Sequence, residues 1–449
     1  MYPKISPVRA LVLCAAVVTY VLPAPAAPTY TLTVSAGTAG AHVYPTMFGT
    51  NIVYNAVDVA QWPTFLSTFN ALGMKSLRYP CGVLTEAEFD FNDSNGPAND
   101  CITLTHFLQA VEANNLTPIL VMPTKRFRSN YTTTGAQYAK NFVKAVNIDH
   151  GIAGGEQFGT TQTVQLWEMG NEYYTDNSGG APLSPTTYGK IANKFGTAMK
   201  TIDASIIPVV QFHRSSPNDA QTIADQLTPG VLERCVTHLY PGGSETFSSV
   251  QSQIESGATI FGLAPMITEW NMANDFTTGL TLGNYLPKLF QAQVDAGVAV
   301  STQWPLMWWN NSVDTALATN TGQLRPPGQV YLWLNLCANN RNSVPTSSSA
   351  PAISCLAWKD NSGHLSLLVL CGASQSNAQV AITINGYNGS NFVVTSAQRL
   401  YAAAGPGSET ANTPALVTNV SAAKSGNVLT ITTNKNTKQE VIRIDITRL

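Results

Sequence analysis

The chain has 449 residues, of which 11% are charged, and its formal net charge is -2. This length leaves room for two domains, one of them large enough for a barrel of about 250 residues. The charges form no basic footprint, so a nucleic-acid-binding function is excluded, and a surface for polymeric acids is not indicated either.

The N-terminus has the pattern of a secretory signal peptide. Lys4 and Arg9 precede an apolar segment at 10–22, which is followed at 24–27 by the small residues of a cleavage site. The apolar segment is too short to serve as a membrane anchor. We therefore assign residues 1–27 to a signal peptide and predict a secreted, extracellular protein with no membrane association after cleavage.

Six cysteines remain after this cleavage, and an even number in an exported protein predicts disulfide bonds. Their spacing suggests Cys81 with Cys101 and Cys355 with Cys371, but it does not decide the pairing. The sequence contains no Cys-x-x-Cys motif, so a zinc site is not expected.

The segment 28–43 contains an alternating pattern at 29–35, which predicts a strand that joins the β-sandwich rather than the central domain. From residue 44 to residue 341, strand and helix patterns alternate. The predicted strands are 46–54, 76–80, 117–123, 164–172, 206–212, 235–240, 264–271 and 298–308. The predicted helices are 63–72, 105–114, 135–147, those that begin at Ser184-Pro185 and Ser216-Pro217, 247–261, 280–296 and 328–339.

Eight strand-helix units predict a closed parallel barrel, and a doubly wound open sheet is the alternative. After residue 342 helical patterns disappear. Short apolar runs between Gly, Asn and Ser then predict an antiparallel β-sandwich, with strands at 365–370, 379–384, 391–396, 428–433 and 441–446. The predicted fold is α/β, a (β/α)8 TIM barrel at 44–341 with a C-terminal antiparallel β-sandwich domain at 342–449.

Two of the predicted barrel strands deliver a glutamate at their carboxyl end. The run 164–172 ends in Asn171-Glu172, and the run 264–271 carries Glu269. Burying an unpaired carboxylate costs several kcal/mol, so the alternative to a functional role is a salt-bridged or helix-capping glutamate. Two carboxylates across a barrel mouth form the apparatus that cleaves a glycosidic bond, one as acid and one as nucleophile or charge stabiliser.

The residues at four predicted strand ends resemble the motifs of retaining glycoside hydrolases of clan A. The motifs are Leu77-Arg78-Tyr79-Pro80, Trp167-Glu168-Met169-Gly170-Asn171-Glu172, His238-Leu239-Tyr240 and Thr268-Glu269-Trp270-Asn271. The resemblance is greatest to family 51, the α-L-arabinofuranosidase family, and it covers nearly all of the mature chain. It implies a (β/α)8 barrel followed by a β-sandwich.

The resemblance also implies a role for each matching residue. Glu172 is the general acid/base and Glu269 is the nucleophile. Asn171 binds the sugar hydroxyl next to the anomeric carbon, while Arg78 and Tyr240 orient Glu269 and keep it ionised. The predicted substrate-binding set is completed by His238, which contacts Glu172 or the substrate, by Trp304, a platform for a sugar ring, and by Asn51.

Several of these residues also have purely structural interpretations. Arg78 is the partner expected for a barrel salt bridge with Glu168, whose own role we expect to be structural because it lies deeper in the barrel. His238 is alternatively a core histidine. Three tryptophans, Trp304, Trp308 and Trp309, are alternatively core aromatic residues that join the barrel to the sandwich. For Trp308 and Trp309 this is the preferred interpretation.

Two positions depart from the family pattern. Cys81-Gly82-Val83 stands where family 51 usually has Gly-Gly-Asn. The third strand ends in a basic cluster at 125–128, which is either a solvated loop or a grip on a substrate carboxylate. The second interpretation favours a uronic acid substrate, as in the glucuronidase-like family 79 of the same clan.

The sequence therefore predicts a secreted retaining glycoside hydrolase that acts on plant-type polysaccharide or oligosaccharide, most of all an α-L-arabinofuranosidase. The alternatives are an endo-β-glucanase or xylanase, a β-glucuronidase, and a non-catalytic carbohydrate-binding protein of the cell wall. Double displacement by two glutamates requires no metal and no cofactor. The expected partner is a carbohydrate substrate, and sugar, linkage, exo or endo action and oligomeric state stay open.

Overall fold

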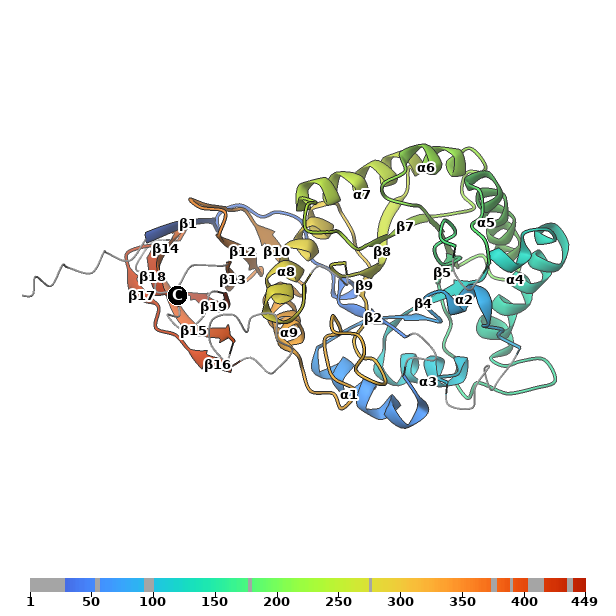
Figure 1. The fold of residues 1–449 in the computed structure, drawn as a ribbon, viewed down its shortest axis with the longest axis horizontal. Coiled ribbons are helices and arrows are strands. Elements are labelled where there is room, and N and C mark those ends of the chain that lie inside the picture. The colour runs from blue at the N-terminus through green and yellow to red at the C-terminus, as the bar shows by residue number, and fades with distance from the viewer. Residues whose placement is uncertain are drawn as a thin grey trace, which may run out of the picture.

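The computed structural model describes residues 29–52, 57–92, 101–176, 180–273, 277–372, 378–387, 391–402, 416–433 and 439–449. The signal peptide predicted at 1–27 lies outside these residues. Figure 1 shows a barrel of alternating strands and helices beside a β-sandwich. Two helices of the barrel, α8 (Gly279–Asp295) and α9 (Pro326–Ala338), lie between the two bodies.

The barrel is closed by eight parallel strands in sequence order, and β9 pairs with β2. The strands are β2 (Gly49–Asn51), β3 (Ser76–Tyr79), β4 (Thr117–Met122), β5 (Leu166–Met169), β6 (Ile207–Gln211), β7 (Arg234–Leu239), β8 (Ala264–Trp270) and β9 (Ser301–Gln303). Further helices are α1 (Trp62–Ala71), α2 (Leu84–Ala87), α3 (Leu104–Asn114), α4 (Ala136–Val143), α5 (Pro185–Lys200), α6 (Pro217–Ala224) and α7 (Phe247–Phe261). The predicted (β/α)8 barrel is confirmed.

The first and last barrel strands are shorter than predicted. Residues at the start of the predicted strand 46–54 form a 3-10 turn, Pro45–Met47, so that β2 begins at Gly49. A Cβ atom at Gly49 would lie 2.5 Å from the Ser76 carbonyl oxygen, so the close approach of β2 to β3 requires glycine there. At the other end, β9 stops before Pro305, because proline has no N–H to donate to a sheet.

The barrel interior is apolar at the amino ends of the strands and polar at the carboxyl ends. The apolar layer consists of Ile119, Leu166, Val209, Val236, Met266 and Val300. Because alternate residues of a strand point to the same face, the residues two positions further on also point inward. Five of them are polar and buried, namely Glu168, Gln211, His238, Thr268 and Thr302. The first four form the floor of the candidate site.

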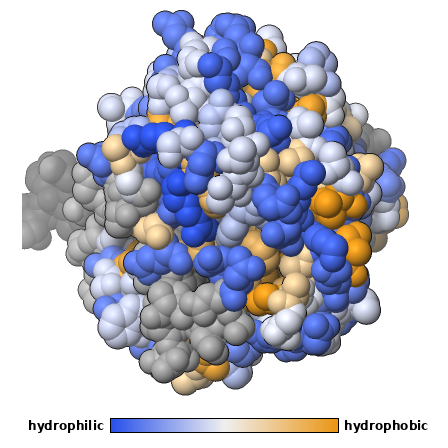
Figure 2. Space-filling view, turned by 90° about the vertical axis from the view of Figure 1, so that its right-hand side faces the viewer, coloured by the Kyte–Doolittle hydropathy of each residue, from blue (hydrophilic) through white to orange (hydrophobic). Residues whose placement is uncertain are grey.

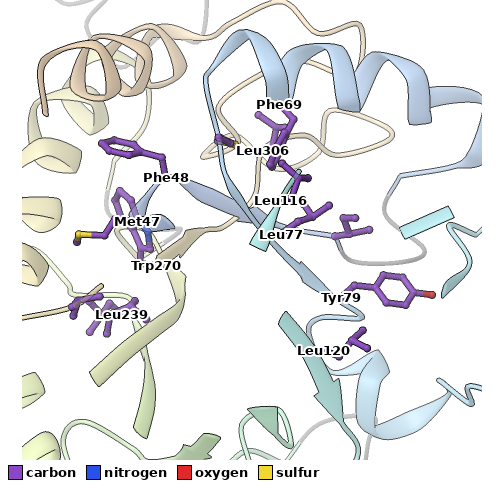
Figure 3. Packing of buried hydrophobic residues seen from close by; sticks show 14 of the residues in the cluster. Met47, Phe48, Phe69, Leu77, Tyr79, Leu116, Leu120, Leu239, Trp270 and Leu306 are labelled. Carbon is purple, nitrogen blue, oxygen red and sulfur yellow. The ribbon is translucent and has the colours of Figure 1, made fainter. Parts of the chain in front are cut away.

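The opposite faces of the strands pack against the helices and form the largest apolar core. Figure 3 shows Phe48, Leu77 and Trp270 among these buried side chains. Trp270 is fully buried and stacks on Tyr331 of α9, with ring centroids 6.1 Å apart. Each such large apolar side chain stabilises the fold by about 1.5–3 kcal/mol relative to an exposed one.

The β-sandwich consists of two sheets. The five-stranded sheet has the order β11 (Thr346–Ser348), β1 (Thr29–Ser35), β14 (Gln379–Asn385), β18 (Val428–Thr432) and β17 (Ala423–Ser425). The six-stranded sheet has the order β10 (Asn342–Val344), β12 (Ile353–Lys359), β13 (Leu365–Cys371), β19 (Glu440–Arg448), β15 (Phe392–Tyr401) and β16 (Leu416–Asn419). β1 pairs in parallel with β14, whereas the other pairs of the sandwich are antiparallel.

The six-stranded sheet is buried on both faces where it meets the barrel. Leu365 and Leu367 of β13 pack in the core between the two sheets, whereas Leu368 and Leu370 belong to the core of the barrel. Trp358 of β12 is fully buried in that same barrel core. A strand covered on both faces is apolar along its length, and β13 accordingly has no exposed residue.

The disulfide prediction is wrong for the described cysteines. All six described cysteines are buried, and none of them is in a disulfide bond: Cys81, Cys101, Cys235, Cys337, Cys355 and Cys371. In the pairing of β12 with β13, Cys355 lies opposite Val369 and Cys371 lies opposite Ile353. The two thiols are therefore diagonal neighbours, a separation that is too long for a disulfide bond.

The face of the barrel that is remote from the sandwich is mainly hydrophilic, with smaller hydrophobic areas (Figure 2). Within the described ranges, none of the helices combines the length and the apolar character needed to span a membrane.

Candidate active site

Glu172 lies on a tight turn beyond β5. The turn begins at Gly170, whose φ is +80°, and Glu172 itself has a φ of +47°, in the left-handed region that side-chain-bearing residues rarely adopt. A Cβ atom at position 170 would lie 2.5 Å from Thr124 Oγ1, so this position requires glycine for space as well as for conformation. The turn therefore sets the direction of the Glu172 side chain, which is 22% exposed.

Glu269 lies within β8 and is aimed inward by a β-bulge. The register between β7 and β8 shifts between Thr237 and His238, so that His238 is opposite Glu269. Thr268 points into the barrel, and strict alternation would turn Glu269 outward. The bulge instead leaves both side chains inside the barrel, because an extra residue re-aims the side chains that follow it. The Glu269 side chain is only 7% exposed.

Arg78, the third residue of β3, links two carboxylates at the barrel axis. Its Nε and Nη2 donate to the two oxygens of Glu168 at 2.7 and 2.9 Å, and its Nη1 donates to Glu269 Oε1 at 2.7 Å. The Arg78 side chain is fully buried. Burial favours the neutral guanidine, but the two carboxylates outweigh it and raise the pKa of Arg78 above its usual value. Both interpretations of Arg78 thus hold at once, the salt bridge with Glu168 and the contact with Glu269.

Tyr240 and His238 come from the end of β7 and contact both candidate catalytic carboxylates. The Tyr240 hydroxyl donates to Glu269 Oε2 at 2.9 Å. Nδ1 of His238 lies 3.1 Å from Glu172 Oε1 and 3.5 Å from Glu269 Oε2. His238 is therefore placed between the two glutamates rather than in an apolar core.

The electrostatics of the site place a proton on His238. Burial lowers the pKa of His238, but Glu269 together with Glu168 and Glu172 raises it to about 9. Burial raises the pKa of Glu172, but the hydrogen bond and charge of His238 outweigh this effect and hold it below its usual value. The buried Glu168 has a lowered pKa for a similar reason, chiefly the charge of Arg78. The pair His238–Glu172 therefore retains one proton at neutral pH, and it titrates as a unit.

The two candidate catalytic carboxylates are close together. One ligand atom each from Glu172, His238 and Glu269 lie within 4.8 Å of one another. A retaining glycosidase has its carboxyl groups about 5–5.5 Å apart, whereas an inverting enzyme needs about 6.5–9.5 Å to admit a water molecule. These three residues are also a possible set of metal ligands. However, both oxygens of Glu269 already accept hydrogen bonds, from Arg78 and Tyr240, so the geometry does not call for a metal ion.

Two asparagines complete the surroundings of Arg78. Asn51 Oδ1 accepts from Nη1 of Arg78 at 3.1 Å, and Asn171 Oδ1 accepts from Nη2 at 3.0 Å. The Nδ2 group of Asn171 is buried and has no hydrogen-bond partner among the described residues. A buried amide donor without a partner is costly, so this group is available for a ligand hydroxyl.

The predicted core role of the tryptophans after β9 is wrong. Trp309 is 49% exposed. Trp308 is partly buried and packs with Trp304 against Cys81, which follows the carboxyl end of β3. Trp304 also meets the ring of Tyr240 edge to face, with centroids 6.2 Å apart. The reason is that residues 304–324 form a loop on the active-site side of the barrel, so its aromatic side chains line that end.

The basic cluster at 125–128 is engaged mainly in contacts within the protein. Arg126 donates to the Tyr138 hydroxyl at 3.1 Å, and Arg128 donates to the Pro182 carbonyl at 3.0 Å. Lys125 is buried, and its Nζ donates to the Thr175 carbonyl at 2.9 Å. Burial lowers the pKa of Lys125, while the charges of Glu86 and Glu172 oppose this shift.

The sequence analysis missed several polar residues of the site. Glu86, in α2, is buried and touches the backbone at the end of β5. Tyr174 lies in the turn that carries Glu172 and contacts the ring of His213, with ring centroids 4.4 Å apart and the two planes tilted by 50°. Gln211 and Thr268 could have been found from their spacing, because each lies two positions after an apolar inward-facing residue. No such pattern marks Glu86.

Comparisons with known proteins identify the fold. No protein-family model and no curated protein match the sequence. The family 51 α-L-arabinofuranosidase from Bifidobacterium longum is similar in structure, with a TM-score of 0.72, 15% identity and coverage of 93% of this chain and 99% of that chain. The family 51 arabinofuranosidase from Xanthomonas axonopodis pv. citri has a TM-score of 0.69, 12% identity and coverage of 93% and 100%.

A protein described by a different activity shares this fold. CelM2, a bifunctional glucanase-xylanase from a metagenome library, has a TM-score of 0.65, 14% identity and coverage of 94% of this chain and 100% of that chain. The chain thus has the fold of clan A glycoside hydrolases, and its resemblance to family 51 is confirmed at the level of the fold. The fold alone does not decide which of the activities named for these proteins, if any, this chain has.

Proposed function

We propose that the protein is a secreted retaining glycoside hydrolase, and that it releases α-L-arabinofuranosyl units from plant-type polysaccharide or oligosaccharide. The observation that carries this proposal is the pair of carboxylates, Glu172 and Glu269, whose facing oxygens lie within 4.8 Å at the carboxyl ends of barrel strands. This separation suits a reaction in which one carboxylate attacks the sugar directly.

In the proposed first step, an oxygen of Glu269 attacks the anomeric carbon while Glu172 protonates the departing glycosidic oxygen. The guanidinium of Arg78 and the hydroxyl of Tyr240 support the ionised form of Glu269, because each donates a hydrogen bond to it. In the second step, Glu172 removes a proton from water, which cleaves the glycosyl ester on Glu269. The unpartnered Nδ2 of Asn171 is the donor proposed for the neighbouring sugar hydroxyl.

The proton for the first step is held by the pair His238–Glu172. A general acid must be protonated when the substrate is bound, yet the charge of His238 lowers the pKa of Glu172 in the free protein. A bound sugar would cover the exposed part of Glu172, and loss of water raises the pKa of a carboxyl group. We infer that substrate binding shifts the shared proton from His238 towards Glu172.

A second candidate is an endo-β-glucanase or xylanase, and the tryptophans after β9 favour it. Trp309 is half exposed, and Trp308 lies beside Trp304 at the barrel mouth. Consecutive aromatic side chains suit an extended chain of sugar rings, because each ring offers an apolar face. The contacts of residues 125–128 with the protein itself leave less support for a β-glucuronidase.

A hydrolysis screen of the mature protein tests the proposal. It uses aryl α-L-arabinofuranoside, β-D-xyloside, β-D-glucoside and β-D-glucuronide, together with arabinoxylan and β-glucan. The expected result is selective cleavage of the arabinofuranoside with retention of the anomeric configuration. NMR of the first-formed product measures that configuration. Cleavage of β-glucan or xylan alone would select the second candidate, and binding without cleavage would select the non-catalytic protein.

A further inference from the structure

Glu86 is a buried carboxylate that takes no part in the proposed chemistry. It is 1% exposed, and its two oxygens accept four hydrogen bonds. Oε2 accepts from the backbone N–H groups of Thr124 and Lys125, each at 2.7 Å. Oε1 accepts from Thr124 Oγ1 and from the backbone N–H of Asn171, each at 3.0 Å. One side chain thus joins the loop after β4 to the turn after β5.

Lys125 holds the far end of the same turn. Its Nζ donates to the Thr175 carbonyl at 2.9 Å. Thr175 in turn donates to the Glu172 carbonyl, from its N–H at 3.0 Å and from its hydroxyl at 2.9 Å. The backbone N–H of Lys125 is bound to Glu86, so the two residues are linked to each other as well. The helix α2 that carries Glu86 is drawn close to β4 and β5 in Figure 1.

The turn needs such support because its backbone is unfavourable. Glu172 has a φ of +47°, and a side-chain-bearing residue keeps this conformation only where the surroundings impose it. The Cα atom of Gly170 lies so close to Glu86 that an added Cβ would be 3.0 Å from Glu86 Oε1. The Glu172 carboxyl extends from this turn. Among the described side chains, its main hydrogen-bond partner is His238.

We propose that Glu86 and Lys125 are positioning residues that clamp the turn 171–175 and thereby aim the Glu172 carboxyl at the leaving-group oxygen. Neither residue touches the reacting atoms. This proposal rests on the proposed function and adds to it the device that holds the acid/base in place. It requires that losing the clamp harms proton donation more than it harms nucleophilic attack by Glu269.

The test is the Glu86→Gln variant, assayed on two glycosides of the same sugar. Gln keeps the shape, but its amide group must face at least one backbone N–H, so a donor meets a donor. The glycoside with a poor alcohol leaving group needs protonation, whereas the dinitrophenyl glycoside does not. We expect kcat/KM on the first to fall roughly 10- to 100-fold, since small misplacements have effects of this size. On the second, kcat/KM, which reports formation of the glycosyl ester and not its hydrolysis, should change by less than about 3-fold.

The second variant, Lys125→Met, keeps the apolar stem and removes the ammonium group, and it should show the same selectivity with a smaller loss. Lys125→Arg, which keeps a donor, should recover part of it. The matched control is Asp445→Asn, which alters another buried carboxylate, in β19 of the sandwich, 5% exposed. Equal losses on both glycosides, or no loss, in Glu86→Gln would overturn the proposal.

A measurement that does not depend on activity separates this proposal from the proposed function. If the wild-type protein cleaves no glycoside, the proposed function fails. Hydrogen exchange of the segment 166–176 then tests the clamp directly. Faster exchange in Glu86→Gln and Lys125→Met than in Asp445→Asn is expected, and equal exchange in all three would refute the clamp.

Discussion

The ends of β5 and β8 deliver the same side chain in two different ways. Glu269 stays within its strand, is re-aimed by a bulge and is 7% exposed, with hydrogen bonds from Arg78 and Tyr240. Glu172 lies beyond its strand on a left-handed turn and is 22% exposed, with His238 as its neighbour. The first carboxylate is thus held by donors that favour its charge, and the second by a group that can exchange a proton.

The different surroundings of Glu269 and Glu172 are those that the two carboxylates of a double displacement require. A nucleophile must stay ionised and keep its distance to the anomeric carbon, and a buried guanidinium serves both needs. An acid/base must gain and lose a proton during each turnover, so it needs contact with solvent and with a titratable partner. The sharpest experiments therefore alter one strand end at a time.

The largest effect is expected for Glu269→Gln. Without the attacking oxygen the glycosyl ester cannot form, so kcat/KM should fall by roughly 10⁴-fold or more on every glycoside, whatever its leaving group. Steady-state assays on the sugar identified by the screen measure this loss, with circular dichroism to verify folding. Activity near the wild-type value would remove Glu269 from the mechanism.

A smaller and selective effect is expected for Glu172→Gln. General acid–base catalysis contributes about 10²–10⁴-fold, so natural linkages should lose this factor, whereas an activated aryl glycoside should lose less in the first step. Measurement of kcat/KM on both substrate types decides the matter. Uniform losses on the two types would mean that Glu172 does not act on the leaving group.

Replacement of Arg78 by Met should lower stability as well as activity, because Arg78 also donates to the proposed nucleophile Glu269. It leaves Glu168 and Glu269 buried without their cation, which costs about 3–5 kcal/mol. Arg78 holds the pKa of Glu168 below its usual value of 4.5, so its stabilisation is present above that pH and is lost as the pH falls through the lowered value. Urea unfolding at pH 7 and at pH 4 should show the larger deficit at pH 7. An equal deficit at both would contradict the ionic origin.

The pH dependence of kcat/KM tests the pair His238–Glu172. The raised pKa of His238, about 9, keeps the shared proton bound below that pH, so activity should decline as the pH rises through about 9. In His238→Gln the carboxyl alone must hold the proton, and the alkaline limb should move down by at least about one pH unit. An unmoved limb would assign it to another group.

The smallest effect is expected for Tyr240→Phe. The change removes one of the hydrogen bonds to Glu269 and leaves the ring in place beside Trp304. A roughly 10-fold loss in kcat, about 1.4 kcal/mol, is expected. The rate of glycosyl-enzyme formation in single-turnover experiments measures it, and a loss as large as that of Glu269→Gln would point to a collapsed site instead.

Periodicity predicts the fold well because the pattern of a barrel is repeated and regular. The alternation of strand and helix patterns from residue 44 onward identified the barrel, and the strand 29–35 coincides with β1. Short sandwich strands such as β10 and β17 were missed, because three residues carry no period. The proposed disulfides failed because spacing along the chain does not give strand register, which places Cys355 opposite Val369.

The sequence predicted which residues form the candidate site but not how they are arranged. Motifs pointed to Glu172 and Glu269, and the structure places the first on the turn beyond β5 and the second near the end of β8. Strict alternation, however, would turn Glu269 out of the barrel, and only the bulge between β7 and β8 brings it in. Glu86 was missed because it lies in a four-residue helix, and its partners are backbone groups that no sequence pattern reveals.

The parallel pairing of β1 with β14 has a consequence for synthesis. The strand 29–35 is made before the whole barrel, yet its partner at 379–385 is translated roughly 350 residues later. At about 5–20 residues per second, β1 must wait tens of seconds with an unpaired edge. The barrel, by contrast, has all its strands within one continuous stretch. The nascent chain is therefore expected to complete the barrel first and to close the sandwich only when translation is nearly finished.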